Sequence, residues 1–302
     1  MGTPEFAAVS LKKLYENGYE VACVITRTDK PRSRGMKVTA SPVKIAAQEH
    51  GTPVFQPETP NSTEALDLIR NLGCDLIALV AYGKILPHAM LAIPPLGCVN
   101  IHASLLPKYR GAAPVQWSVL QGERETGVTS ILMADKIDTG DILLTKHTPI
   151  GDDETAAELY DRLSYLGADL LVETLEAIAS GTAVRIPQSR AEVTHAPALH
   201  REMSPIDWAE TAQNIKNKVR GLTPWPIATA VIGGAILKIF EVEARLCKTG
   251  KQPGEIVAAG GEGIEIACAD GSVVIKKLQP PGGRRMAAAE YLRGHPLVNE
   301  NH

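Results

Sequence analysis

The first half of the chain alternates between two hydrophobic periods, and this alternation restricts the fold more than any other feature. Runs of apolar, often β-branched residues are typical of buried strands, and they cover 21–26, 75–82, 97–101, 128–133 and 142–147. Segments with the spacing of amphipathic helices lie between them, at 5–17, 42–50, 62–72 and 113–121. Each helical segment is followed by a glycine, the residue that most easily ends a helix.

Strands that alternate with helices predict an α/β domain with a doubly wound, mostly parallel sheet of the Rossmann type, covered on both faces. Ligands of such sheets bind beyond the carboxyl ends of the strands. Residues 1–4 lead at once into the first helix, although a strand normally precedes such a turn. We therefore expect the sheet to lack one strand, either because the chain is truncated by a few residues or because its first residue is misassigned.

The second half of the chain changes character. A long helical segment, with Asp152 or Asp153 as its expected cap, carries leucines at helical spacing that we interpret as core, and Gly181 ends it. Short strands with a hairpin signal at Asp270-Gly271 follow a proline-containing stretch, and they predict a small antiparallel β-barrel of the OB type. The expected domains are 1–181 and 206–302, joined by a linker over 182–205.

Composition narrows the class of protein. A length of 302 residues suits two domains, and the five cysteines are scattered without a CxxC pair. We therefore expect no metal site and no disulfide framework, and a reducing cytoplasm as the location. The chain shows neither a secretory leader nor an apolar run of ~18 residues, so no membrane is expected. The net charge of −3 argues against a uniformly basic nucleic-acid binder, but it leaves room for a local basic patch.

Three polar residues are candidates for catalysis. Asn100 and His102 lie two positions apart at the end of a predicted strand, so their side chains share one face. Asn donates hydrogen bonds to a developing oxyanion, and His exchanges protons near neutral pH. Asp138 lies in a turn before the next strand, where a carboxylate could orient the histidine. Taken singly, His102 could equally be a satisfied buried histidine, and Asp138 could merely cap a turn.

No candidate nucleophile accompanies these residues. The Gly-x-Ser-x-Gly pattern of a nucleophile elbow is absent from the sequence. Direct group transfer with stabilisation of an oxyanion therefore fits better than a covalent intermediate.

The run from Asn100 to Pro107, continued by residues 109–114, resembles the formyltransferases that use 10-formyltetrahydrofolate. Further motifs of that family occur in the expected order: Met1-Gly2-Thr3-Pro4-Glu5-Phe6, Ala81-Tyr82-Gly83, Glu125-Thr126-Gly127-Val128-Thr129, Asp138-Thr139-Gly140-Asp141, His195-Ala196-Pro197, Ile206-Asp207-Trp208, Pro224-Trp225-Pro226 and Leu278-Gln279-Pro280. The resemblance extends over essentially the whole chain. It implies a monomeric transferase that moves the formyl group of 10-formyltetrahydrofolate, its cosubstrate, to the α-amino group of methionine esterified to initiator tRNA.

The same resemblance implies roles for individual residues. Asn100, His102 and Asp138 fall on the catalytic positions of the family. Two segments are expected to bind the folate. The first comprises Ser104, Leu105, Leu106 and Pro107. The second is expected to act through its backbone groups and comprises Leu79, Tyr82, Gly83 and Leu86.

A basic loop is the candidate contact for tRNA. Between Arg27 and Lys44 the chain carries six basic residues and one acidic residue. The resemblance implies a finger that contacts the acceptor end of tRNA through Arg32, Arg34 and Lys37. A solvated surface loop is the alternative. The basic residues of the second domain suit contacts with the tRNA backbone.

Three alternative functions fit the sequence less well. A formyltransferase that acts on the amine of a sugar nucleotide would keep the chemistry and change the acceptor. A tRNA- or folate-binding protein without activity is disfavoured by the intact Asn100, His102 and Asp138. A dinucleotide-binding enzyme is disfavoured because no GxGxxG follows a strand.

Overall fold

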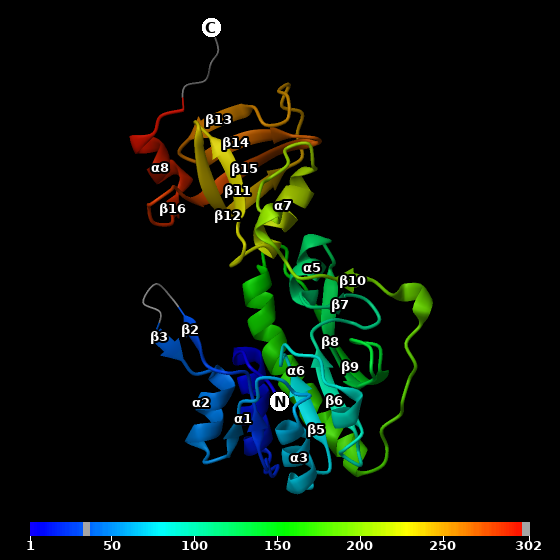
Figure 1. Ribbon diagram of the computed structural model, residues 1–302. Coiled ribbons are helices and arrows are strands. Elements are labelled where there is room, and N and C mark those ends of the chain that lie inside the picture. The colour runs from blue at the N-terminus through cyan, green and yellow to red at the C-terminus, as the bar shows by residue number, and fades with distance from the viewer. Residues whose placement is uncertain (33–36, 298–302) are drawn as a thin grey trace. The chain divides into compact units, whose positions relative to one another are not determined.

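The computed structural model describes residues 1–32 and 37–297 and divides the chain into two compact units (Figure 1). The first unit comprises Met1–Pro114, Glu125–Pro149 and Tyr160–Pro197. The second comprises Val115–Arg124, Ile150–Leu159 and the residues from Ala198 onward. Within the described residues, no helix is both long enough and apolar enough to cross a membrane.

The first unit has the expected alternation of helices and strands. Its elements are α1 (Glu5–Glu16), β1 (Val24–Ile25), β2 (Lys30–Arg32), β3 (Lys37–Thr39), α2 (Pro42–Glu49), β4 (Val54–Phe55), α3 (Thr63–Leu72), β5 (Ile77–Val80), α4 (His88–Leu91), β6 (Cys98–His102), β7 (Arg110–Gly111), β8 (Glu125–Leu132), β9 (Asp141–Pro149), most of α6 (Ala156–Ala179), a short 3-10 helix (Arg190–Glu192) and β10 (His195–Ala196). The four predicted helices of this half are confirmed to within one residue at each end, except that the last, α5 (Pro114–Leu120), belongs largely to the second unit.

The central sheet has the order β5-β6-β8-β9, and β1 pairs separately with β4. The pairs β1–β4 and β5–β6 are parallel, as predicted for a doubly wound sheet. The pairs β6–β8 and β8–β9 are antiparallel, so the parallel arrangement does not extend over all five predicted strands. Only eight residues join β8 to β9. A parallel crossover needs a dozen residues or more, so this pair has to be antiparallel.

Helices cover both faces of this sheet, as the sequence predicts. On one face, α3 and α4 pack on β5 and β6 through a core that includes Ile69, Leu79 and Met90. On the other face, the rings of Phe6 in α1 and Tyr160 in α6 lie 5.1 Å apart. Gly167 in α6 lies so close to Ile101 and Phe6 that a Cβ there would come within 3.1 Å of Ile101. The domain is therefore an α/β layered structure.

Helix α6 begins later than expected. The hydroxyl of Thr155 accepts the backbone N–H of Glu158, and the Glu158 carboxylate accepts the backbone N–H of Thr155. This reciprocal pair is a capping box. The expectation that Asp152 or Asp153 caps the helix is therefore wrong, because the capping box needs a glutamate three residues after the cap, and only Thr155 meets that condition.

Met1 and Gly2 lie between β1 and β5 and hydrogen bond to both strands. The Gly2 N–H donates to the Ile25 carbonyl (3.1 Å), and the Val80 N–H donates to the Met1 carbonyl (2.9 Å). The Met1 ammonium donates to the Ala78 carbonyl (2.6 Å). These two residues therefore occupy the place of a strand. Beside them lies a cavity of about 440 Å³, called the edge groove below, which is lined by 19–25, 72–78 and side chains of α1 and α6.

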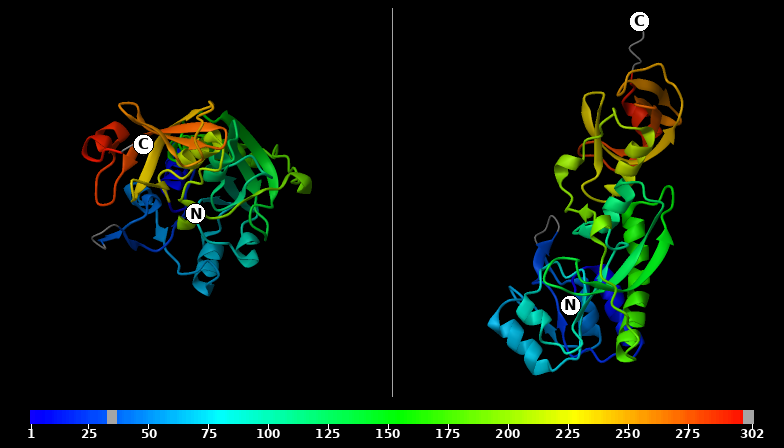
Figure 2. Two further views of the ribbon diagram at one scale, coloured as in Figure 1. Left: turned by 90° about the horizontal axis from the view of Figure 1, so that it is seen from above. Right: turned by 90° about the vertical axis from the view of Figure 1, so that its right-hand side faces the viewer.

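The second unit is built on one antiparallel sheet. Its elements are α5, a short 3-10 helix (Arg201–Met203), α7 (Ala212–Gly221), β11 (Ala228–Ile232), β12 (Ala235–Arg245), β13 (Ile256–Gly260), β14 (Gly263–Cys268), β15 (Gly271–Gln279), β16 (Met286–Ala287) and α8 (Ala288–Gly294). The strand order is β11-β12-β15-β14-β13, with β16 added beside β15. The sheet is strongly curved (Figure 2) and encloses a core to which α7 and α8 contribute Ile215 and Tyr291. The predicted antiparallel domain is thus present. A tight turn joins β14 to β15 as predicted, but its two residues are Ala269 and Asp270, one position earlier than expected, because Gly271 already pairs with Cys268 as the first residue of β15.

Candidate active site

Strand β6 places Asn100 and His102 on the sheet face that α3 and α4 cover. Both side chains are buried, with exposed fractions of 8% and 5%. The amide of Asn100 has no hydrogen-bond partner among the residues that the structure describes. An unpartnered amide at the carboxyl end of a strand is available to a substrate, because a buried polar group otherwise finds a partner within the protein.

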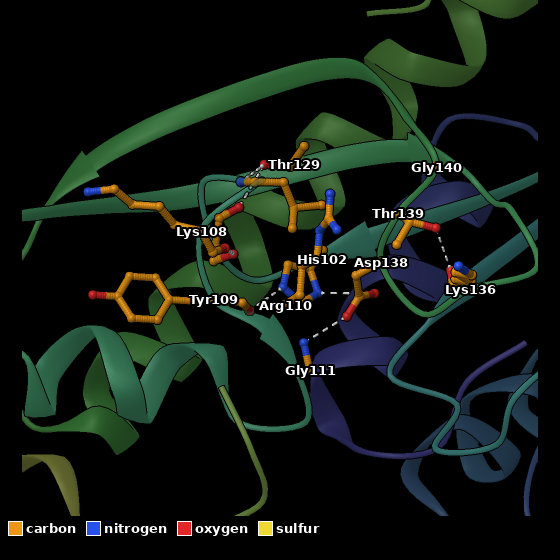
Figure 3. A network of polar contacts seen from close by, with 12 residues as sticks. His102, Lys108, Tyr109, Arg110, Gly111, Thr129, Lys136, Asp138, Thr139 and Gly140 are labelled. Atoms are coloured by element: carbon orange, nitrogen blue, oxygen red, sulfur yellow. Dashed lines mark hydrogen bonds and ion pairs between the residues drawn. The ribbon is translucent and has the colours of Figure 1, made fainter. Parts of the chain in front are cut away.

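The hydrogen bonds of His102 define its tautomer. Its Nε2 lies 2.9 Å from the Tyr109 carbonyl oxygen (Figure 3). A carbonyl oxygen only accepts, so Nε2 carries a proton and donates it. Its Nδ1 lies 3.6 Å from Oδ1 of Asp138, which is longer than a hydrogen bond. Nδ1 is therefore the ring nitrogen that remains free to meet a substrate atom.

Asp138 reaches His102 from the loop between β8 and β9. Its carboxylate is only 11% exposed, and its Oδ2 accepts the backbone N–H of Gly111 at 2.9 Å (Figure 3). The residue has a φ of +53°, in the left-handed region that non-glycine residues seldom adopt. Gly140, two residues later, has no space for a side chain, since a Cβ there would overlap the Leu132 carbonyl oxygen. The loop conformation thus aims a nearly buried carboxylate at Nδ1 of His102.

The loop from Ser104 to Pro107, which was expected to bind folate, is fixed by internal hydrogen bonds. Thr129 donates its hydroxyl to the Ser104 carbonyl (2.7 Å) and accepts the Leu106 N–H (3.1 Å). The Ser104 hydroxyl is fully buried and donates to the Lys108 carbonyl (2.7 Å). Leu105 and Pro107 are half-buried. Any contact of Ser104 or Leu106 with a ligand is therefore left to the backbone.

The second expected folate segment divides into two groups of residues. Leu79, Tyr82 and Leu86 are buried in the core beneath α3 and α4, so their side chains face away from solvent. Gly83 is exposed, and the guanidinium of Arg27 lies against it, 3.2 Å from where a Cβ would stand. The expectation that this segment acts through backbone groups stays a prediction, and Gly83 is its most accessible candidate.

The basic loop forms a β2–β3 hairpin that pairs the backbone of Arg32 with that of Lys37. Arg34 lies outside the described residues. At the base of the hairpin, Lys44 forms an ion pair with Asp29 (2.5 Å), and Gln56 donates to the Arg27 carbonyl (2.7 Å). Two of the seven charged residues counted in the sequence thus neutralise each other.

Sequence reasoning missed Gln188 altogether. It was assigned to the linker, yet its side-chain amide contacts Arg110 and the loop of Asp138. No local signal could have found it, because Gln188 and Asp138 are 50 residues apart in the chain.

Both units of the chain match models of known protein families. Residues 1–175 match the family model described as formyl transferase, and residues 198–296 match the model of the formyl transferase C-terminal domain. The α/β unit and the antiparallel unit therefore belong to the class of the formyl transferases.

Curated relatives refine this class. The methionyl-tRNA formyltransferase of Citrifermentans bemidjiense is 48% identical over 297 residues, covering 98% of this chain and 93% of that protein. The methionyl-tRNA formyltransferase of Ruminiclostridium cellulolyticum is 45% identical over 306 residues, covering 98% and 96%. The chain belongs to the methionyl-tRNA formyltransferase family and is an enzyme, a transferase of protein biosynthesis.

Solved structures share the fold at lower identity. An N-formyltransferase from Helicobacter canadensis, in complex with folinic acid and dTDP-3-aminofucose, has a TM-score of 0.66 at 19% identity and covers 94% of this chain and 97% of its own. HypX from Aquifex aeolicus, in complex with tetrahydrofolic acid, has a TM-score of 0.59 at 22% identity, covering 81% and 43%. At these identities the likeness concerns the fold alone.

Proposed function

We propose that this enzyme transfers the formyl group of 10-formyltetrahydrofolate to the α-amino group of methionine esterified to initiator tRNA. The observation that carries the proposal is the near-full-length identity of 48% with a methionyl-tRNA formyltransferase. The solved neighbours that bind folinic acid and tetrahydrofolic acid support a folate as donor. A cytoplasmic location and a monomeric state stay predictions.

The neutral α-amine attacks the formyl carbon on N10 of the folate. A bond forms between the amine nitrogen and that carbon, and the former formyl oxygen gains negative charge. The bond from the carbon to N10 then breaks, while one proton of the amine moves to N10. The tetrahydrofolate leaves with its N10 protonated, so atoms and charge balance without a further reactant.

The site residues suit these steps. The unpartnered amide of Asn100 and a protonated Nδ1 of His102 donate hydrogen bonds to the oxyanion, which stabilises it. Asp138, 3.6 Å from that Nδ1, orients the imidazole and accepts the proton of the amine, directly or through water. Removal of one oxyanion donor costs about 2.7–4 kcal/mol of barrier. Asn100→Ala should therefore lower kcat by about 10²-fold or more while the thermal midpoint changes little.

The acceptor is tested by incubating the enzyme with 10-formyltetrahydrofolate and one of two amines. Methionyl initiator tRNA should be formylated, and a dTDP-amino sugar should not. Formylation of the sugar alone would replace the proposal with the sugar-nucleotide alternative. That alternative is less well supported, because the sugar N-formyltransferase resembles this chain at only 19% identity.

We assign tRNA binding to the basic loop, with Arg32, Arg34 and Lys37 as the contacts. Six basic residues lie between Arg27 and Lys44, and the single acidic one is already paired with Lys44. Cations that neutralise phosphates make affinity fall as salt rises. Replacing Arg32 or Lys37 by alanine should reduce the slope of log affinity against log salt, whereas an unchanged slope would favour a solvated loop.

A further inference from the structure

Gln188 follows helix α6 in a segment that returns to the sheet. Two residues earlier, Ile186 forms reciprocal hydrogen bonds with Ile142 at the start of β9, with N–O distances of 2.8 and 2.9 Å. This bridge anchors the segment beside the loop that carries Asp138. Gln188 is half-buried, so water competes only partly for its amide.

The Gln188 amide uses its full hydrogen-bonding capacity. Its Nε2 donates to the carbonyl oxygens of Asp138 (2.9 Å) and Gly140 (2.7 Å). Its Oε1 accepts from Nε (3.0 Å) and Nη2 (2.6 Å) of Arg110. Carbonyl oxygens only accept and a guanidinium only donates, so the partners dictate which end of the amide points where. Neither Glu nor Leu could make the same four bonds.

These four bonds connect the two segments that hold the Asp138 carboxylate. One segment is the loop 138–140, in which Asp138 adopts its left-handed conformation. The other is β7, where Arg110 precedes the Gly111 whose N–H donates to Asp138 Oδ2. Gln188 therefore fixes both the backbone that carries the carboxylate and the donor that orients it. A non-glycine residue in the left-handed region is disfavoured by its Cβ, so the loop needs such a brace to keep this conformation.

We propose that Gln188 is a positioning residue that holds the Asp138 carboxylate toward His102. It acts through Asp138 and does not itself meet the substrates. The inference rests on the proposed function only in so far as Asp138 takes part in the transfer; the geometry it describes is independent of the acceptor.

The test compares Gln188→Leu in two backgrounds. In the wild-type enzyme, Gln188→Leu should lower kcat about 10- to 100-fold with little change in either KM, because substrate contacts are retained. In an Asp138→Asn background, the same substitution should change kcat by less than about 2-fold, because residues that act through one another are not additive. Wild-type kcat in the single variant, or an equal loss in both backgrounds, would overturn the proposal.

Two further variants separate positioning from general stability. Gln188→Glu keeps the length and the partner Arg110 but sets a carboxylate against two carbonyl oxygens, so it should lose most of the activity that Gln188→Leu loses. Gln213→Leu removes the amide that donates to Asn217 (3.0 Å) in the second unit, and it should leave kcat unchanged. A similar loss of kcat in Gln213→Leu would show that removing any glutamine side-chain hydrogen bond lowers kcat, which would contradict a specific positioning role for Gln188.

A readout without turnover distinguishes failure of this inference from failure of the proposed function. The imidazole ¹⁵N resonances of His102 report the environment of Nδ1, and they should change in the same direction in Gln188→Leu and in Asp138→Asn. Unchanged resonances in Gln188→Leu would refute the positioning role even if the acceptor were another amine. An enzyme that fails to formylate methionyl-tRNA but shows the change would refute only the proposed acceptor.

Discussion

At the scale of the residue, Tyr82 shows that a residue can belong to a functional motif while its side chain lies in the core. The motif Ala81-Tyr82-Gly83 was expected to contribute to folate binding, yet the Tyr82 side chain is fully buried, and its hydroxyl lacks a hydrogen-bond partner among the described residues. Burial raises the pKa of this phenol, so the group remains neutral at physiological pH.

Tyr82→Phe should therefore stabilise the protein and leave catalysis unchanged. Removing an unsatisfied buried hydroxyl relieves a desolvation penalty, and we expect the free energy of unfolding to rise by about 1 kcal/mol in urea titrations. Tyr15→Phe is the matched control, because the Tyr15 hydroxyl donates to Thr52 at 2.6 Å and its loss should be destabilising. A marked increase in the KM for the folate in Tyr82→Phe would instead support a ligand contact by the hydroxyl.

At the scale of the element, the edge groove has the geometry of a vacant strand position. Met1 and Gly2 already bond to β1 on one side and to β5 on the other, and the cavity beside them is lined by the segments that precede both strands. An extended segment fused to Met1 could continue this pairing.

An apolar, β-branched extension of about five residues should therefore raise the thermal midpoint. Burial of its apolar side chains and new backbone hydrogen bonds to the neighbouring strands should outweigh the entropy lost on ordering the extension. Scanning calorimetry should show an increase of several degrees. A Gly/Ser extension of equal length is the control, and an equal increase for both extensions would show that the groove is not a strand site.

In a protein whose chain begins at Met1, the buried Met1 ammonium should make stability depend on pH. Burial lowers its pKa from 8.0 to about 6, only partly opposed by nearby cysteines, so the unfolded chain binds more protons than the native one between these values. Stability should thus rise as pH increases from about 6 to about 8, by at most about 2–3 kcal/mol. Urea titrations across this range measure the slope. N-terminal acetylation should abolish it, and a slope that persists in the acetylated protein would assign the effect to other groups.

At the scale of the whole molecule, the distribution of charge matters more than the net value of −3. Many cations of the second unit are already paired with acidic side chains: Lys216 with Asp153, Arg245 with Glu243, Glu262 and Glu265, Lys276 with Glu243, Lys277 with Glu241, and Arg284 with Glu290. Several basic residues of the second unit form no ion pair within the described part of the chain, among them Lys218, Lys238, Lys248, Lys251 and Arg293.

Lys248→Ala and Lys277→Ala change the net charge equally but should affect tRNA binding differently. If Lys248 contacts a phosphate, its loss should reduce the slope of log affinity against log salt by about 0.7–0.9. The ion pair of Lys277 with Glu241 (2.5 Å) already neutralises that cation, so its loss should leave the slope unchanged. Filter binding at several salt concentrations measures both slopes, and equal slopes in the two variants would contradict this division of the cations.

Structural features that depend on residues close together in the sequence are predicted more successfully than features that depend on residues far apart. The helix that ends at Gly73 and the hairpin turn next to Gly271 depend on neighbours in the chain, and the structure has both, the turn one residue earlier than predicted. The direction of β8 and β9 was not predicted, because apolar periodicity says which residues are buried and not which way a strand runs. The cap of α6 was misplaced because two aspartates offered the same local signal as Thr155.

The class of fold, the family and the candidates Asn100, His102 and Asp138 can all be recognised from the amino-acid sequence, since they depend on local spacing and on motifs. The folded chain is needed to see which nitrogen of His102 is free, that the Tyr82 side chain faces the core, and that Gln188 contacts the loop of Asp138. Such contacts join segments tens of residues apart, and only folding brings these segments together.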